Sequence, residues 1–169
     1  NTPGTCGAAV NYTTPVGTDN CSGGITTQTA GLASGDTFPV GVTTNTFEVT
    51  DAAGNKTSCS FTVTVVDNQV PTISCPANIS VNNTPGTCGA AVTYTTPVGT
   101  DNCSGATTTQ TAGLASGATF PVGTTTNTFE VTDAAGNKIS CSFTVTVVDN
   151  QAPTITCPAN ISVNNTSGT

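Results

Sequence analysis

Residues 60–65 read SFTVTV, an alternation that places Phe61, Val63 and Val65 on one face of an extended chain. The polar side chains fall on the opposite face, so the stretch predicts a half-buried β-strand. Residues 46–50, TFEVT, alternate in the same way, and the intervening DAAGN supplies the Gly and Asn that a tight hairpin requires. Together these residues predict an antiparallel hairpin at the centre of the fold.

The same pattern returns with a period of 82 residues, since residues 1–69 match residues 83–151 at all but six positions. The cysteines recur with this period as well. Self-similarity at a fixed period is typical of an array of modules used repeatedly as a spacer, strut or interaction surface. Such uniformity suits a structural polymer better than an enzyme, whose site needs residues that occur once.

One period counted from Val70 contains about seven short strand candidates. They lie near residues 72–75, 78–82, 88–95, 106–111, 118–122, 127–132 and 139–148. Helices have little support, because threonine is abundant, Gly and Pro interrupt the chain every few residues, and no apolar set recurs at helical spacing. The sequence therefore predicts an all-β fold of immunoglobulin-like or fibronectin-like β-sandwich modules in tandem, with about seven strands each.

The charge balance excludes several classes of function. Lys56 and Lys138 are the only basic residues against nine carboxylates, which gives a net charge of -7 and excludes nucleic acid as a partner. No apolar run approaches the roughly 18 residues needed for membrane insertion. The chain has no histidine, nucleophile elbow or phosphate-binding loop. Asp101 and Asp133 could converge as a carboxylate pair, but no pattern indicates it. We expect no enzyme activity and no cofactor.

Several ordered blocks carry a resemblance to a known family. They are PTISCPANI at 71–79, GTC at 86–88, GTDNC at 99–103, TFPVG at 119–123, TDAAGN at 132–137 and CSFTVTV at 141–147. Together they resemble the hyalin repeat, or HYR domain, over the whole period. The resemblance implies an immunoglobulin-like extracellular module, found in tandem in adhesive and matrix proteins of animals and in bacterial surface proteins, with no catalytic residues.

In the frame of that family a module begins near Val70, which predicts three parts. Residues 1–69 are expected to be a module lacking its first strand, residues 70–151 a complete module, and residues 152–169 the first strand region of a following module. The chain also lacks an initiator Met and a signal peptide, so we expect a piece of a longer protein. It is either a window of a continuous array or a subunit that donates residues 152–169 to the truncated module of the next subunit.

Eight cysteines, four per period, indicate disulfide bonds rather than zinc, because the chain contains no CxxC pair and no histidine. Small disulfide-reinforced modules are typical of oxidising compartments. The sequence therefore predicts an extracellular or cell-surface location.

Four cysteines per module permit three connectivities, and the expected sandwich guides the choice between them. The first and last strands of a sandwich lie near one another, which favours Cys75 with Cys141 and leaves Cys88 to close a short loop. The predicted pairs are Cys6 with Cys21, Cys88 with Cys103, Cys75 with Cys141, and Cys59 with Cys157 of a neighbouring unit. The alternative is a bridge across the module junction, with Cys59 joined to Cys75 and Cys141 joined to Cys157.

Acidic residues near the module junctions and hairpin turns are weak candidates for calcium binding. They are Asp51, Asp67, Asp133 and Asp149. A polar linker with turn-forming residues and a stiffening proline explains them better, because carboxylates are sparse and no dense acidic loop is present. We favour no metal site.

Sequons of the form Asn-x-Ser/Thr predict candidate glycosylation sites, although a chain this rich in Asn, Thr and Ser also produces them by chance. The candidates are Asn11, Asn20, Asn55, Asn78, Asn82, Asn102, Asn160, Asn164 and Asn165.

These observations predict a structural repeat module of an extracellular filament or surface-adhesin stalk. Neighbouring copies of the repeat would be its partners, assembled head to tail and stapled by disulfides. The alternative is an adhesion module that binds a glycan or protein ligand through its loops. The six differences between the copies are scattered rather than gathered in one loop, which favours the structural role.

Overall fold

The computed structural model describes residues 1–164, and every regular element in this range is a β-strand. The all-β fold predicted from the alternating residues is confirmed. Within the same range no helix is long and apolar enough to cross a membrane. The elements form two sandwich-like modules, of which the first contains β1–β5 and the second contains β6–β11.

The second module is built on a long antiparallel hairpin. Its strands are β6 (Ile79–Asn82), β7 (Gly89–Ala91), β8 (Thr107–Ala112), β9 (Thr119–Pro121), β10 (Gly123–Thr132) and β11 (Lys138–Val148). One sheet has the order β6-β11-β10-β8, and β7 pairs with β9 in a separate two-stranded sheet. All pairs are antiparallel except β6 and β11, which run parallel. The strand expected at 72–75 is reduced to an isolated bridge between Thr72 and Thr100.

The first module repeats this plan without a counterpart of β6 in the described residues. Its strands are β1 (Gly7–Ala9), β2 (Ile25–Ala30), β3 (Thr37–Pro39), β4 (Gly41–Thr50) and β5 (Lys56–Val65). The larger sheet has the order β2-β4-β5, and β1 pairs with β3. The outer edge of β5, where β6 would lie, therefore carries no strand from residues 1–164.

The core of the second module is formed by aromatic and β-branched side chains on the inner face of its larger sheet. Phe129 and Phe143 are stacked with their ring centroids 6.4 Å apart, and the ring of Tyr94 meets Phe143 edge-on at 4.9 Å. Ile73, Ile79 and Val81 pack against this cluster from the N-terminal part of the module. Residues 70–82, which we call the capping segment, thus complete the core.

Corresponding residues of the first module are less well covered. Phe143 and Val145 are 2% and 0% exposed, whereas their repeat counterparts Phe61 and Val63 are only half-buried. The two modules are nearly identical in sequence here. The difference in burial therefore comes from the capping segment, which covers the second module and has no counterpart over the first among the described residues.

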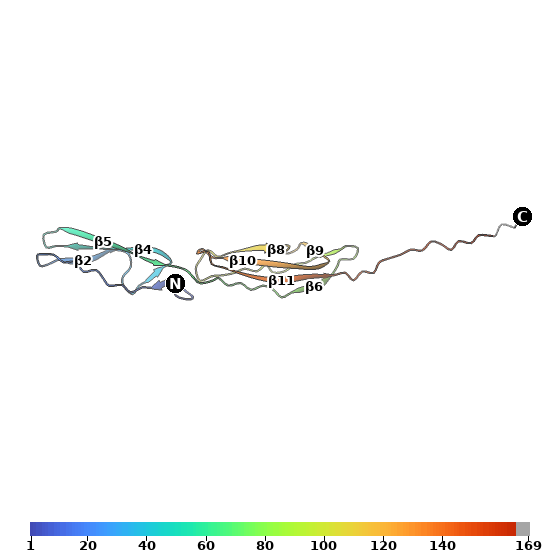
Figure 1. The fold of residues 1–169 in the computed structure, drawn as a ribbon, viewed down its shortest axis with the longest axis horizontal. Helices are drawn as coiled ribbons and strands as arrows, with labels where there is room; N and C mark the ends of the chain where they lie inside the picture. Colours follow the sequence, from blue (N-terminus) through green and yellow to red (C-terminus); the bar gives the residue numbers. More distant parts are fainter. Residues whose placement is uncertain (165–169) are drawn as a thin grey trace.

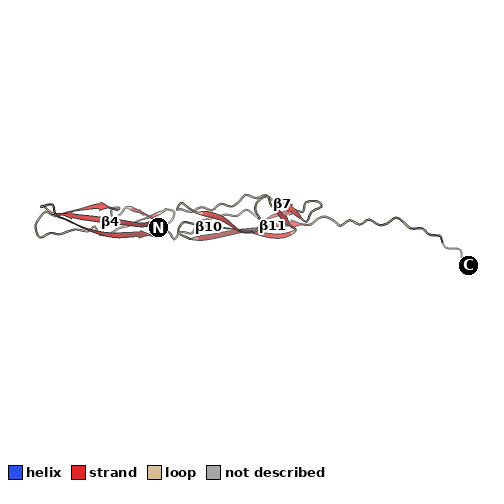
Figure 2. Cartoon of the chain, turned by 90° about the horizontal axis from the view of Figure 1, so that it is seen from above, coloured by secondary structure: helices blue, strands red, loops and turns tan. Residues whose placement is uncertain are grey.

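The two modules lie end to end along one axis, and residues 149–164 run away from the second module as an extended chain (Figures 1 and 2). Residues 152–164 form no strand, and every one of them is exposed. This arrangement leaves three features of interest, which are the junction between the modules, the open edge of β5 and the extended C-terminal segment.

Candidate functional site

A disulfide bond joins the two modules. Cys6, directly before β1, is bonded to Cys103, in the loop before β8, with their Cα atoms 4.9 Å apart. Next to this bond, Asn102 Nδ2 donates a hydrogen bond to the carbonyl of Thr5 at 2.7 Å. The side chain of Cys103 is buried. The junction is therefore a covalent contact between a turn of one module and a loop of the next.

This bond corrects two predicted pairs, Cys6 with Cys21 and Cys88 with Cys103. Neither of these short loops closes on itself, because the loop containing Cys103 packs against the turn of the preceding module instead. Cys21 is the repeat counterpart of Cys103, and Cys88 is the counterpart of Cys6. Both lie at the ends of the modules that face away from the junction, exposed and unbonded.

The hairpin turn between β10 and β11 also holds the linker between the modules. Asn137 Nδ2 donates to the carbonyls of Asp67 and Gln69 at 3.2 and 3.3 Å. On the other side of the linker, Asn1 Nδ2 donates to Asp67 Oδ1 at 2.8 Å. Asn55, the counterpart of Asn137, donates its side-chain N–H only to Asp51. The linker is thus fixed by polar contacts as well as by the disulfide.

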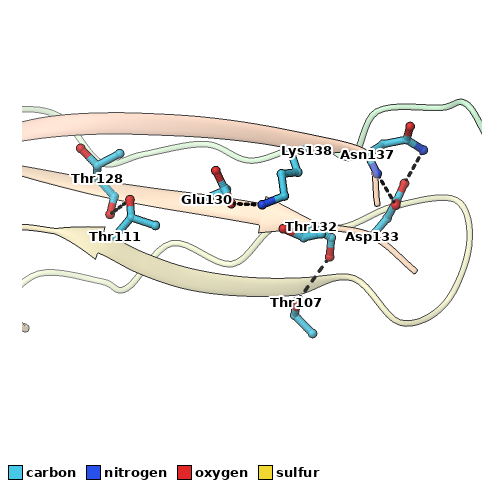
Figure 3. A network of polar contacts seen from close by, with 8 residues as sticks. All are labelled: Thr107, Thr111, Thr128, Glu130, Thr132, Asp133, Asn137 and Lys138. Atoms are coloured by element: carbon cyan, nitrogen blue, oxygen red, sulfur yellow. Dashed lines mark hydrogen bonds and ion pairs between the residues drawn. The ribbon is translucent and has the colours of Figure 1, made fainter. Parts of the chain in front are cut away.

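Asp133 orients the residue that makes these linker contacts. Its carboxylate accepts hydrogen bonds from the backbone N–H and the side-chain amide of Asn137, both at 2.8 Å (Figure 3). Burial by itself raises the pKa of Asp133. The hydrogen bonds from Asn137, with those from the backbone of Gly136 and Ala135, outweigh it and hold the pKa below its ordinary value of 3.8.

We expect the second module to lose stability as the pH falls through this lowered pKa. The unfolded chain binds a proton at Asp133 near pH 4 while the folded module still keeps the carboxylate charged, so the stabilisation is complete above that pH and disappears below it. Asp133→Asn should lower the melting temperature at pH 7 and flatten its fall between pH 5 and pH 2. Melting curves in this range test the prediction, and an unchanged slope in the variant would argue against it.

A second disulfide lies inside the second module. Cys75 in the capping segment is bonded to Cys141 on β11, with Cα atoms 5.7 Å apart, and this is the pair that the sandwich argument favoured. The alternative pairs Cys59 with Cys75 and Cys141 with Cys157 do not form. Among residues 1–164 the free cysteines are Cys21, Cys59, Cys88 and Cys157, and all four are exposed.

A groove of about 220 Å³ lies beside the uncapped edge of β5. Phe47 and Val49 of β4 form its apolar floor. The Pro15–Gly17 loop and the first part of β5 form its sides. We call it the β5 groove, and the residues that line it are Pro15, Val16, Gly17, Thr26, Phe47, Val49, Thr57, Ser58 and Cys59.

The capping segment fills the corresponding space in the second module. Thr72 exchanges two backbone hydrogen bonds with Thr100, at 2.8 and 2.9 Å. The chains approach so closely that a Cβ atom on Gly99 would lie 2.8 Å from the carbonyl oxygen of Thr72. Val131 on the floor is 0% exposed, whereas its counterpart Val49 is half-buried. The β5 groove thus corresponds, in the first module, to the space that residues 70–82 occupy in the second module.

Of the four weak calcium candidates, Asp67 alone joins a cluster of possible ligand atoms in the described chain. Asp67, Asp101 and Cys103 have ligand atoms within 4.8 Å of one another. The Cys103 sulfur is held in the disulfide, so two carboxylates remain, short of the six to eight oxygen ligands that calcium takes. Asp51 and Asp133 instead bind their own turns, and Asp149 accepts a bond from the Gln151 N–H.

The sequons lie mostly on exposed chain. The exposed asparagines are Asn11, Asn20, Asn55, Asn78, Asn82, Asn160 and Asn164, and Asn165 lies outside the described residues. Asn102 differs, because it is partly buried at the module junction and its amide donates to Thr5. Glycosylation at these positions stays a prediction, and Asn102 is the position where the junction leaves least room for it.

The outer face of the larger sheet is polar and carries its own ion pair. Lys138 Nζ lies 2.8 Å from Glu130 Oε1 across the hairpin, and the hydroxyls of Thr107 and Thr111 donate to carbonyls of β10 (Figure 3). Lys56 and Glu48 repeat the ion pair in the first module at 2.7 Å. Both lysines are therefore paired locally, and the described residues present no basic patch.

Comparison with protein families identifies the repeat. The HYR domain model matches two segments of the chain, residues 1–65 and residues 66–147. The chain is 40% identical over 158 residues to hyalin from Strongylocentrotus purpuratus, a match that covers 90% of this chain and 13% of that protein. It is 36% identical over 167 residues to hyalin from Lytechinus variegatus, covering 92% and 30% of the two proteins.

A more distant relative is the serine-rich adhesin for platelets of Staphylococcus aureus, 30% identical over 157 residues, which cover 79% of this chain and 7% of that protein. The chain spans less than a third of the length of each of these relatives. Among solved structures, human protocadherin-24 EC1-2 has a TM-score of 0.33 and 12% identity, with 76% of this chain and 82% of that chain covered.

Proposed function

Because the chain belongs to the HYR domain family, we propose that its modules are structural repeat units of an extracellular filament or of the stalk of a surface adhesin. The modules connect head to tail, and each junction transmits force from one sandwich to the next. The observation that carries this proposal is the disulfide between Cys6 and Cys103, which ties neighbouring modules together covalently.

The polar contacts around this disulfide support a stiff joint. A single linker would leave two modules free to swivel, which is the usual expectation for domains with a small interface. Here the disulfide and the side chain of Asn102 contact the preceding module, and the side chain of Asn137 holds the linker at a separate point. Several attachment points restrict rotation about the linker, and the result is a rod rather than a flexible chain.

The same chemistry supports an extracellular location. Disulfides persist in oxidising compartments and are rare where cellular thiols keep cysteines reduced. The structure contains two such bonds, one inside a module and one between modules. We propose that the rod works outside the cell, where these bonds stay intact.

The stiffness of the junction can be tested by removing its disulfide. Replacing Cys6 and Cys103 together with serine should broaden the distribution of angles between the two modules, because only the linker and a few hydrogen bonds remain. Small-angle X-ray scattering and negative-stain images of the monomeric chain measure this distribution. The expected result is a lower maximum dimension and a wider range of angles than in the unmodified chain.

The matched control is the replacement of Cys21 and Cys88, the repeat counterparts of Cys103 and Cys6, which form no bond within the described chain. This variant should keep the narrow distribution of angles. Equal flexibility in both variants, or a rod unchanged by loss of Cys6 and Cys103, would refute a stiff covalent joint. Saturable binding of a glycan or protein to the module loops would instead support the adhesion function.

A further inference from the structure

We propose that Asn11 is an N-glycosylation site, and that the first module carries there an N-linked oligosaccharide that the second module lacks. Asn11 begins the sequon NYT at residues 11–13, whereas the second module has TYT at the matching residues 93–95. The proposal goes beyond the structural function and depends only on the extracellular location proposed above, because glycans of this kind are attached to exported chains.

The alternation of side chains along residues 11–13 turns the sequon outward. Tyr12 points into the module, where its ring lies edge-on to Phe61 with the centroids 5.0 Å apart and its hydroxyl donates to the Leu32 carbonyl at 2.6 Å. Successive side chains of an extended chain point to opposite sides. Asn11 and Thr13 therefore face away from the core, and both are exposed. The two side chains that define the sequon are thus presented together at the surface by the tyrosine between them.

The side-chain amide of Asn11 takes no part in holding the fold of residues 1–164. The hydrogen bonds around it belong to the backbone of its neighbours. The Val10 N–H donates to the Asp36 carbonyl at 3.2 Å, and the Gly35 N–H donates to the Val10 carbonyl at 2.9 Å. A glycan on Asn11 Nδ2 leaves both of these bonds in place.

Three other sequons use the asparagine side chain for a contact within the structure. Asn55 donates to the carboxylate of its own hairpin turn at 2.7 Å, and Asn102 donates to a carbonyl across the module junction at 2.7 Å. Asn78 accepts a bond from a backbone N–H of β11 at 2.9 Å. A glycan on any of these side chains crowds a contact that the fold uses, which does not happen at Asn11.

The second module has the same backbone at this place but lacks the asparagine. The Tyr12 N–H donates to Ser34 Oγ at 2.9 Å. The Tyr94 N–H donates in the same way to Ser116 Oγ at 2.8 Å. Thr93, which stands where the first module has its asparagine, is exposed although the capping segment covers the core of its module. The position therefore faces solvent in a module with a complete core.

A second difference between the modules lies beside the first. Asp36 is replaced by Ala118, yet the Ala118 carbonyl accepts the corresponding bond from the Val92 N–H at 3.2 Å. Two of the six differences between the copies thus fall on neighbouring segments and change the surface without changing the backbone. In the first module this surface carries an exposed carboxylate and an exposed amide, a polar setting that suits a hydrated glycan.

The modification is a group transfer, and its donor is a lipid-linked oligosaccharide pyrophosphate. Asn11 Nδ2 forms a bond to the anomeric carbon of the first sugar, while the bond from that carbon to the pyrophosphate oxygen breaks. The lipid pyrophosphate leaves with the electron pair of this bond, and the amide loses one proton. The step consumes no oxidant and no reductant.

The site is tested on the full chain secreted from cultured animal cells. Peptide N-glycosidase F in heavy-oxygen water converts each glycosylated asparagine into a labelled aspartate, which mass spectrometry locates in the tryptic peptide 1–56. The expected result is label at Asn11, and its loss together with the mass of one glycan in Asn11→Gln and in Thr13→Val. An unlabelled Asn11 in the secreted chain, or label that persists in Thr13→Val, would overturn the proposal.

Thr93→Asn tests the same place in the second module. This substitution completes a sequon at an exposed position with matching backbone contacts, so it should add one glycan to peptide 57–138. Thr93→Gln is the matched control, because it brings a similar amide without a sequon and should add none. No gain in Thr93→Asn, or an equal gain in both variants, would contradict the argument from exposure. The angles between the modules test the structural function separately, and no outcome here changes that result.

Discussion

Replacing Cys75 and Cys141 together with serine is expected to lower the free energy of unfolding of the second module by about 4 kcal/mol. This disulfide closes a loop between residues 66 apart in sequence, and the chain-entropy model assigns a large stabilisation to loops of this length. The bond also anchors the capping segment against β11. Its loss should therefore both destabilise the module and loosen the segment that completes its core.

Denaturant unfolding can report on the second module alone. The chain has two tyrosines, Tyr12 and Tyr94, and no tryptophan, so in a Tyr12→Phe background the fluorescence of Tyr94 follows the second module. Cys59→Ser is the matched control, because Cys59 holds the position of Cys141 in the repeat but is free. A similar loss in both variants, or no loss in the double variant, would count against a stabilising bond between Cys75 and Cys141.

The second large effect is expected for Phe143→Ala, which should cost the second module about 3–5 kcal/mol of stability. Phe143 is 2% exposed and contacts the rings of Phe129 and Tyr94. Phe61→Ala in the first module should cost clearly less, because Phe61 has the same sequence neighbours and a stacked partner in Phe47, yet is only half-buried. The difference between the two costs measures the contribution of the capping segment.

The same tyrosine fluorescence measures both costs. For Phe143→Ala, the fluorescence of Tyr94 is followed in the Tyr12→Phe background. For Phe61→Ala, the fluorescence of Tyr12 is followed in a Tyr94→Phe background. The measurement is made at a concentration where the chain is monomeric, so that contacts between copies do not contribute to the stability of either module. Equal losses of stability in the two modules would mean that the capping segment adds nothing to the core.

Local patterns in the sequence were sufficient to predict most of the long strands of the fold. The alternation at 60–65 and its repeat at 142–147 identified the long hairpin, and the candidates near 78–82 and 106–111 correspond to β6 and β8. Each of these signals depends only on neighbouring residues. The strand expected at 72–75 was weaker, because it makes a single bridge to Thr100 and its attachment depends on a disulfide.

The junction could not be read from the sequence because of the repeat itself. Cys21 and Cys103 lie in the same GTDNC motif, and the pattern cannot say whether Cys6 meets the copy in its own module or the copy in the next. Only the packing of two modules distinguishes these partners. The sequence could not predict the difference in side-chain burial for the same reason. Phe61 and Phe143 occupy identical motifs and differ only in the segment that covers them.

Peptide mapping under non-reducing conditions tests the covalent junction most directly. Trypsin cuts this chain only after Lys56 and Lys138, so Cys6 and Cys21 share one peptide while Cys103 lies in the next. With free thiols alkylated in the monomeric chain, we predict that peptide 1–56 stays bonded to peptide 57–138 through Cys6 and Cys103, with Cys21 and Cys88 alkylated. Release of peptide 1–56 with an internal bond between Cys6 and Cys21 would contradict the stapled junction and the rod built on it.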